Sequence, residues 1–223
     1  MKENPGQTGF SPGANLRVDK ALNVLPEGRR ILDIGCGSGA FLTQAQKRFH
    51  EVYGVDISET AISLARENDI MADIVDLNSQ DLPYPDEYFD CLTLLSTVQY
   101  FYDPDATLRE CHRVLSPSGT ILLSVPNIRA FWRLARLVIL GYFPRVSLDE
   151  EGYDGGTLHY FAYVNLKELL SRNGFNILWA HGIFCVPTVL SRLPDQGIIG
   201  TIKREFFSAE IFIAAMKPLT EEL

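Results

Sequence analysis

Residues 31–39 read ILDIGCGSG, a short apolar run that passes directly into three alternating glycines. The run Arg30–Ile34 has the length and composition of a buried strand, and Phe41–Phe49 follows with the spacing of a helix. Glycines in the connecting loop permit positive φ and let a ligand come close to the backbone. The sequence therefore predicts a strand, a glycine loop and a helix, with a ligand site at the loop.

The same alternation of strands and helices extends along the chain. Such spacing predicts a parallel sheet covered by helices on both faces, and the last two strands, joined by a loop, favour an antiparallel pair at the sheet edge. We expect one α/β domain over residues 1–223, built on a Rossmann-like, doubly wound, seven-stranded sheet that is mostly parallel with an antiparallel closing strand. The expected helices are 15–25, capped by Asn15, 41–49, 60–68, 105–115 and 166–173; the expected strands are 30–34, 52–55, 71–75, 90–95, 120–125, 175–186 and 209–216, with a turn at 117–119.

The composition narrows the class of protein. Hydrophobic residues make up 46% and charged residues 22% of the chain, which is typical of a globular protein, and the net charge of −8 argues against binding to nucleic acid. The four cysteines are scattered without a CxxC pair, which argues against a disulfide framework and a metal site. The start, MKENPGQTGFSPG, lacks the order of a signal peptide, and no apolar run is long enough for a transmembrane segment. We expect a cytoplasmic protein with a flexible lead-in at residues 1–14.

Two carboxylates distinguish between the ligands that a glycine loop can bind. Gly35, Gly37 and Ala40 satisfy the dinucleotide pattern G-x-G-x-x-G/A. Asp33, however, stands at the mouth of the loop, where it would oppose a pyrophosphate by about 4 kcal/mol at about 4 Å for an effective dielectric of ~20. S-adenosylmethionine instead carries an ammonium and a sulfonium, and no phosphate. Asp56 ends the next strand, where a carboxylate can accept both ribose hydroxyls, a feature that fits NAD equally well. The loop therefore favours S-adenosylmethionine.

Four segments in order resemble the successive motifs of the class I methyltransferases: LDIGCGSG, VYGVDIS, DLPYPDEYFDCLTLLSTVQY and RVLSPSGTILLSVPN, which cover roughly residues 15–126. The resemblance implies S-adenosylmethionine as cofactor. It implies that the loop shapes the pocket for the methionine part and that the polar residues after the later strands hold the ribose and adenine. The implied cofactor residues are Asp33, Gly35, Cys36, Gly37, Gly39, Asp56, Ile57, Asn78, Ser79 (with Asp76 as an alternative for adenine), Leu95, Ser96 and, for the cofactor carboxylate, Arg17.

Residues 127–160 interrupt the alternation and are expected to form a helical cap or lid. The stretch 127–146 carries four arginines and no acidic residue, and Arg129, Arg133 and Arg136 have the spacing of one helical face. One interpretation is a lid whose arginines, with Arg129 and Arg133 foremost, meet an anionic substrate, or whose helix, 129–143, meets a protein partner or a membrane surface. The other is a cap helix with solvated arginines and its apolar side packed on the core.

The acceptor side offers fewer signals. His159 is the best candidate for a general base, because a neutral histidine can remove a proton from a hydroxyl or amine, although a packed or surface histidine is the alternative. Gln99 and Tyr100 are candidate substrate contacts, and Gln99 stands where many relatives carry a histidine. Methyl transfer to a nucleophilic acceptor mainly needs in-line placement, so a catalytic side chain is not required.

The sequence thus predicts methyl transfer from S-adenosylmethionine to a small-molecule acceptor, with the O-, N- or C-atom left open. The order Val-Pro-Asn, an aromatic and arginine-rich helix, then Gly-Tyr-Phe-Pro resembles the methyltransferase-like proteins called MetW. This likeness keeps open a second function, that of a non-catalytic cofactor-binding subunit that regulates a partner enzyme.

Overall fold

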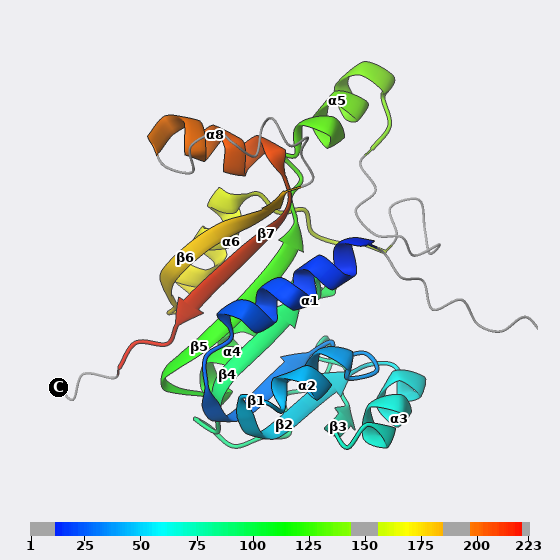
Figure 1. The fold of residues 1–223 in the computed structure, drawn as a ribbon, viewed down its shortest axis with the longest axis vertical. Helices are drawn as coiled ribbons and strands as arrows, with labels where there is room; N and C mark the ends of the chain where they lie inside the picture. The colour runs from blue at the N-terminus through cyan, green and yellow to red at the C-terminus, as the bar shows by residue number, and fades with distance from the viewer. Residues whose placement is uncertain (1–11, 144–155, 185–196, 220–223) are drawn as a thin grey trace, which may run out of the picture.

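A computed structural model of the chain describes residues 12–143, 156–184 and 197–219, and its centre is a seven-stranded sheet (Figure 1). The strand order is β3-β2-β1-β4-β5-β7-β6, and β7 runs antiparallel to both of its neighbours. All the other pairs are parallel. This confirms the predicted fold class. The strands are β1 (Gly28–Ile34), β2 (Phe49–Asp56), β3 (Met71–Ile74), β4 (Phe89–Leu95), β5 (Leu115–Pro126), β6 (Asn176–Phe184) and β7 (Ser208–Met216).

Helices cover both faces of the sheet, because the central strands present apolar side chains to either side. On one face, Ala21, Leu42 and Ile62 from three successive helices pack on the sheet in one buried cluster. On the other face, Leu108 and Leu166 belong to a second cluster. The helices of the first face are α1 (Pro12–Val24), α2 (Ala40–Ala45) and α3 (Glu59–Glu67), and those of the second are α4 (Pro104–Val114) and α6 (Tyr163–Arg172); α5 (Phe131–Leu140), α8 (Gly197–Phe207) and the short η1 (Val98–Tyr100) complete the set.

Several element boundaries differ from the predicted ones. Helix α1 begins at Pro12, so residues 12–14 of the expected lead-in are helical and Asn15 lies inside the helix instead of capping it; proline is well suited to a first helical turn. Helix α2 ends at Ala45, before the expected limit, because Phe49 is already paired with Gly28 in the sheet. Residues 1–11 lie outside the described part of the chain.

The expected turn at 117–119 forms an irregularity inside β5. The pairing of β4 with β5 jumps from Phe89–Leu115 to Cys91–Thr120, and Ser118 has a φ of 62°. The extra residues instead contact Lys217, which directly follows β7 and whose amide donates to the Gly119 carbonyl at 3.0 Å.

The prediction of only a loop between the last two strands is wrong, since α8 lies there. Its buried residues are Gly200 and Lys203, while Ile198, Ile199 and Ile202 are exposed. Ile198 and Ile202 have the spacing of one helical face, but this apolar face is exposed, so the argument from an apolar stripe packed on the core does not apply to α8. Among the described residues, no helix has the length and apolar content needed to cross a bilayer.

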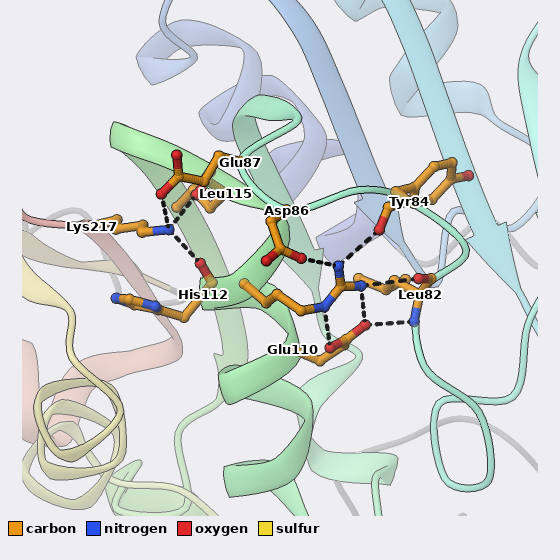
Figure 2. Close-up of polar contacts among 9 residues, drawn as sticks. Leu82, Tyr84, Asp86, Glu87, Glu110, His112, Leu115 and Lys217 are labelled. Atoms are coloured by element: carbon orange, nitrogen blue, oxygen red, sulfur yellow. Dashed lines mark hydrogen bonds and ion pairs between the residues drawn. The ribbon is translucent and has the colours of Figure 1, made fainter. Parts of the chain in front are cut away.

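Two cationic side chains, Arg113 and Lys217, form hydrogen bonds with the segments before and after α4; Figure 2 shows these contacts. Arg113 donates to the carbonyls of Leu82 (3.1 Å) and Tyr84 (2.9 Å) and pairs with Glu110 and Asp86. On the other side of the helix, the buried Lys217 ammonium donates to the carbonyls of Leu115 (2.8 Å) and His112 (3.0 Å) and contacts Glu87. The segment 81–88, which leads into β4, is therefore held by α4, and these contacts fix the amino end of β4.

Candidate functional site

The glycine loop between β1 and α2 is tied to the end of β2. The amides of Gly35 and Cys36 both donate to the Val55 carbonyl, at 2.8 and 3.1 Å. All three loop glycines have positive φ, namely 78° at Gly35, 53° at Gly37 and 77° at Gly39. Side chains with a Cβ rarely adopt this conformation, so the backbone path itself requires glycine.

The space around the three glycines differs. A Cβ on Gly35 would lie 2.5 Å from the Thr97 hydroxyl, and one on Gly39 would lie 3.0 Å from Ile70. These two glycines allow protein segments to pack closely. A Cβ on Gly37 would meet no atom within 4 Å. The loop is therefore open to a ligand at Gly37.

Asp56 stands beside this opening at the end of β2. Its Oδ2 accepts the Gly37 amide and its Oδ1 accepts the Ser58 amide, each at 2.9 Å. Each carboxylate oxygen keeps a further lone pair, so the group is oriented and still able to accept the hydroxyls of a ribose. The next residue, Ile57, exposes 66% of its surface and offers an apolar contact for a flat ring. The structure thus brings together the loop and the carboxylate as predicted.

Asp33 is buried beneath the loop and accepts a hydrogen bond of 2.6 Å from the Thr93 hydroxyl. Burial raises the pKa of this carboxyl to about 7; the Thr93 hydrogen bond opposes the rise and the nearby Asp56 carboxylate adds to it. A cation bound at the loop would favour the ionised form. This environment fits the ammonium and sulfonium of S-adenosylmethionine better than a pyrophosphate.

Cys36 shows no sign of a nucleophile. It is 7% exposed, and burial raises the pKa of its thiol to about 12. The thiol therefore stays protonated at neutral pH. Its sulfur packs toward β2, where a Cβ on Gly54 would lie 2.6 Å from it.

A buried acid that the sequence reasoning missed, Glu210 of β7, organises the third side of the site. Its Oε1 accepts from Arg17 Nε of α1 and from the hydroxyl of Ser96, both at 2.8 Å. Ser96 follows β4 with a φ of 60°. Within the described residues the two terminal guanidinium nitrogens of Arg17 have no hydrogen-bond partner, so they are available for a carboxylate. A glutamate in the apolar strand SAEIFIAAM is the signal that could have pointed to Glu210.

The residues expected at the adenine end form a closed turn. Asp76 accepts the Asn78 amide (3.0 Å) and the Ser79 hydroxyl (3.2 Å), and the Ser79 amide donates to the Asp76 carbonyl (3.0 Å). The side-chain oxygen of Asn78 accepts the amide of Tyr102 at 2.7 Å. The side-chain amide nitrogen of Asn78 has no hydrogen-bond acceptor among the described residues and is therefore free to donate. Adenine contact by Asn78 and Ser79 stays a prediction.

The acceptor-side residues meet at η1, directly after Leu95 and Ser96. Gln99 is 2% exposed, and the amide nitrogen of its side chain, Nε2, donates to the Ser96 carbonyl at 2.8 Å. Its side-chain oxygen is buried and finds no hydrogen-bond partner in the part of the chain that is described. The Gln99 carbonyl accepts the amide of His159 at 3.1 Å, which places His159 beside η1 and Tyr100. An unpaired buried acceptor is costly, so this oxygen is a candidate ligand contact.

The arginine-rich segment has the opposite orientation to the cap that was expected. Helix α5 begins at Phe131, so Arg129 precedes it, and the prediction that it shares a helical face with Arg133 and Arg136 is wrong. Arg129 pairs with Glu205 of α8 at 3.0 Å, and Arg133 donates at 2.8 Å to each of the carbonyls of Asn127 and Ala209. The helix has no buried residue. Arginines therefore attach α5 to the domain and its apolar residues are exposed, so the packed apolar side of the second interpretation is also wrong.

The ends of the expected insertion meet where Asn127 pairs with Phe161. Residues 144–155 of that insertion lie outside the described part of the chain. Substrate contact by Arg129 and Arg133 stays a prediction. Among the described residues, no three His, Cys, Asp or Glu side chains are grouped so that they could hold a metal ion.

Comparison with known proteins agrees with this geometry. Residues 32–123 match the family model described as "Methyltransferase domain". Over 119 residues the chain is 34% identical to the Ubiquinone biosynthesis O-methyltransferase of Alkalilimnicola ehrlichii, which covers 50% of this chain and 48% of that protein. Over 148 residues it is 28% identical to the Ubiquinone/menaquinone biosynthesis C-methyltransferase UbiE of Edwardsiella ictaluri, covering 61% and 59%. The chain spans about half the length of the curated relatives that it matches.

Solved structures share the fold over nearly the whole chain. A SAM dependent methyltransferase from Archaeoglobus fulgidus superposes with a TM-score of 0.69 and 22% identity, covering 94% of this chain and 95% of that one. These comparisons do not test the finer likeness to the MetW proteins, which stays a prediction.

The opening at Gly37 predicts the effect of a single methyl group. Gly37→Ala should cost about 1–2 kcal/mol of stability, because alanine disfavours positive φ, and should lower the affinity for S-adenosylhomocysteine at least tenfold, because the methyl occupies the ligand's approach. Gly197→Ala is the matched control, since Gly197 also has positive φ and no atom within 4 Å of its Cβ position. Calorimetric titration of both variants checks this. Equal affinities would contradict it.

The buried Asp33 predicts a pH dependence of stability. Its pKa rises on folding from an ordinary value of 3.8 to about 7, so between these values the folded protein binds a proton that the unfolded chain has lost. The contribution of Asp33 to stability is therefore fully present below about pH 4 and is lost as the pH rises through about 7, by up to roughly 4 kcal/mol. Asp33→Asn should remove this dependence and be the more stable form at pH 8. Urea unfolding at several pH values measures this dependence. If the free energy of unfolding varied with pH in the same way for the wild type and Asp33→Asn, the pKa of the Asp33 carboxyl would not be raised.

Proposed function

We propose that this chain, which belongs to the class I S-adenosylmethionine-dependent methyltransferase family, transfers a methyl group from S-adenosylmethionine to a small-molecule acceptor. The observation that carries the proposal is the open position at Gly37, next to the Asp56 carboxylate, in the loop that follows the buried Asp33. An anion-lined glycine loop suits a cationic cofactor and opposes a dinucleotide. Bound there, S-adenosylmethionine supplies an activated methyl group on a sulfonium, with a neutral thioether as the leaving group.

In this proposal the chain's own residues mainly bind and orient. Asp56, held by two backbone amides, accepts the ribose hydroxyls. Arg17, fixed by Glu210, meets the carboxylate of the methionine part. Asp33 is ionised by the cation above it. Because three different strands and α1 supply these groups, the cofactor would be held with its methyl directed toward the end of β4, where η1 lies.

The acceptor site that we propose is formed at η1 and the neighbouring His159. The unpaired Gln99 oxygen is placed to accept a hydrogen bond from a hydroxyl or amine of the acceptor. His159 would take the proton where the acceptor must be deprotonated. The named relatives methylate oxygen in one case and carbon in the other, in quinone biosynthesis. They support a lipophilic aromatic acceptor with a hydroxyl group, and leave the methylated atom open.

The cofactor assignment is tested by titrating the purified protein with S-adenosylmethionine, S-adenosylhomocysteine and NAD. We expect saturable binding of the first two and none of NAD. Asp56→Ala should weaken binding at least tenfold, whereas Asp103→Ala, which likewise removes a carboxylate that accepts an amide at the start of a helix, should not. Binding of NAD alone would overturn the assignment. Cofactor binding without turnover of any acceptor would favour the non-catalytic subunit.

Gln99 provides a test of the acceptor site. Gln99→Met keeps the volume, loses the 2.8 Å bond to Ser96 and removes the unpaired oxygen, so stability should change by only about 1 kcal/mol. With the best acceptor from a panel of catechols and hydroquinones, KM should rise about tenfold or more while kcat changes less. Release of S-adenosylhomocysteine reports turnover, and Gln44→Met, an exposed substitution on α2, is the control. An unchanged KM would remove Gln99 from the acceptor site.

A further inference from the structure

The second half of α5 is an apolar projection. Leu137, Val138, Ile139 and Leu140 expose 37, 81, 76 and 62% of their surfaces, and Tyr142, just beyond the helix, exposes 61%. We call these five residues the apolar tip. Figure 1 shows α5 standing clear of the sheet at one end of the molecule, next to α8. Exposed apolar residues gathered in this way mark an interaction surface.

The base of the same helix is firmly attached to the domain. Besides the ion pair of Arg129 with Glu205 and the two carbonyl contacts of Arg133, the ring of Phe131 lies 5.2 Å from that of Phe207. The contacts join α5 to α8 and β7. The apolar tip is therefore held outward by specific contacts.

The directions of the tip side chains distinguish a bilayer from a protein groove. Successive helical residues point about 100° apart, so the four residues 137–140 point to nearly all sides of the helix. A groove in a partner protein takes one stripe of a helix, whereas a helix end that is apolar all round needs an apolar medium on every side. A lipid surface provides that medium.

The charge around the tip fits an anionic surface. The chain has a net charge of −8, yet residues 127–146 contain four arginines and no acid. Arg136 is exposed at the base of the tip, lies 5.6 Å from the ring of Tyr142 and has no carboxylate partner in the described segments. Arginine and tyrosine are residues that favour the headgroup level of a membrane. The acidic remainder of the molecule would be repelled by an anionic lipid surface, so its other faces would not dock there.

We infer that the apolar tip docks the protein on an anionic lipid bilayer. A helix of 10 residues is about 15 Å long, half of the hydrocarbon thickness of about 30 Å, so the tip enters one leaflet without crossing it. Helix α5 follows β5 after only four residues, and thus leaves the domain at the edge of the sheet that carries η1. Docking therefore turns the acceptor side toward the lipid, from which a lipophilic acceptor reaches it; this last step rests on the proposed function.

Vesicle flotation of the whole chain tests the inference. At about 0.1 M salt, the protein should float with phosphatidylcholine vesicles that contain about 30% phosphatidylglycerol, and less with phosphatidylcholine alone. Val138→Ser/Ile139→Ser should lower the partition coefficient at least tenfold. Leu64→Ser/Val164→Ser, which changes two exposed apolar residues on α3 and α6, should leave it unchanged. Arg136→Gln should reduce only the preference for anionic vesicles.

Three results would overturn the inference. They are failure of the wild-type chain to float with either vesicle, equal flotation of the tip variant and its control, and a protein dimer that the tip variant abolishes in the absence of lipid. Asp56→Ala should float like the wild type, because it changes the cofactor site only. Flotation without cofactor binding would therefore refute the proposed function and leave the docking inference intact, and the reverse result would do the opposite.

Discussion

The site depends on the hydrogen bonds that hold the glycine loop against the end of β2. Two loop amides share the Val55 carbonyl, and the Gly37 amide donates to the Asp56 carboxylate. These bonds fix the loop in left-handed conformations and orient the carboxylate beside it. They also determine where a ligand can approach, because they leave the loop open at Gly37, next to the Asp56 carboxylate. The remaining parts of the site are positioned around this contact between the glycine loop and the end of β2.

The buried carboxylates show how the fold tolerates charge for the sake of binding. Among the described residues, Asp33 has one hydrogen-bond donor, Thr93, and burial disfavours its ionised form. Glu210 has two donors from different elements, Arg17 and Ser96. The pKa of Asp33 thus lies near neutral pH, whereas Glu210 belongs to a paired network that holds α1 against the end of the sheet.

Local signals in the sequence are enough to predict the sheet and the placement of the glycine loop beside the Asp56 carboxylate. A run of apolar residues, a set of glycines and an acid at a strand end are all readable within about ten residues. Glu210 and the environment of Gln99 could not be predicted, because both depend on contacts between residues far apart in the chain. The orientation of α5 was misjudged for a related reason. Arg129, just before α5, and Arg133 within it have partners in α8 and β7, and the apolar face of α8 is exposed instead of packed on the core.

The place of β7 in the sheet has a consequence for the order in which the molecule can be completed during synthesis. It is the last strand in chain order, yet it lies between β5 and β6. On a ribosome, β6 emerges before β7, with which it pairs in the described sheet, and its edge stays open until β7 follows. The same strand brings the Ala209 carbonyl that holds α5 and the Glu210 carboxylate that holds Arg17. Closure of the sheet, attachment of α5 and the Arg17 contact thus all wait for β7, so a nascent chain forms these three parts of the molecule together.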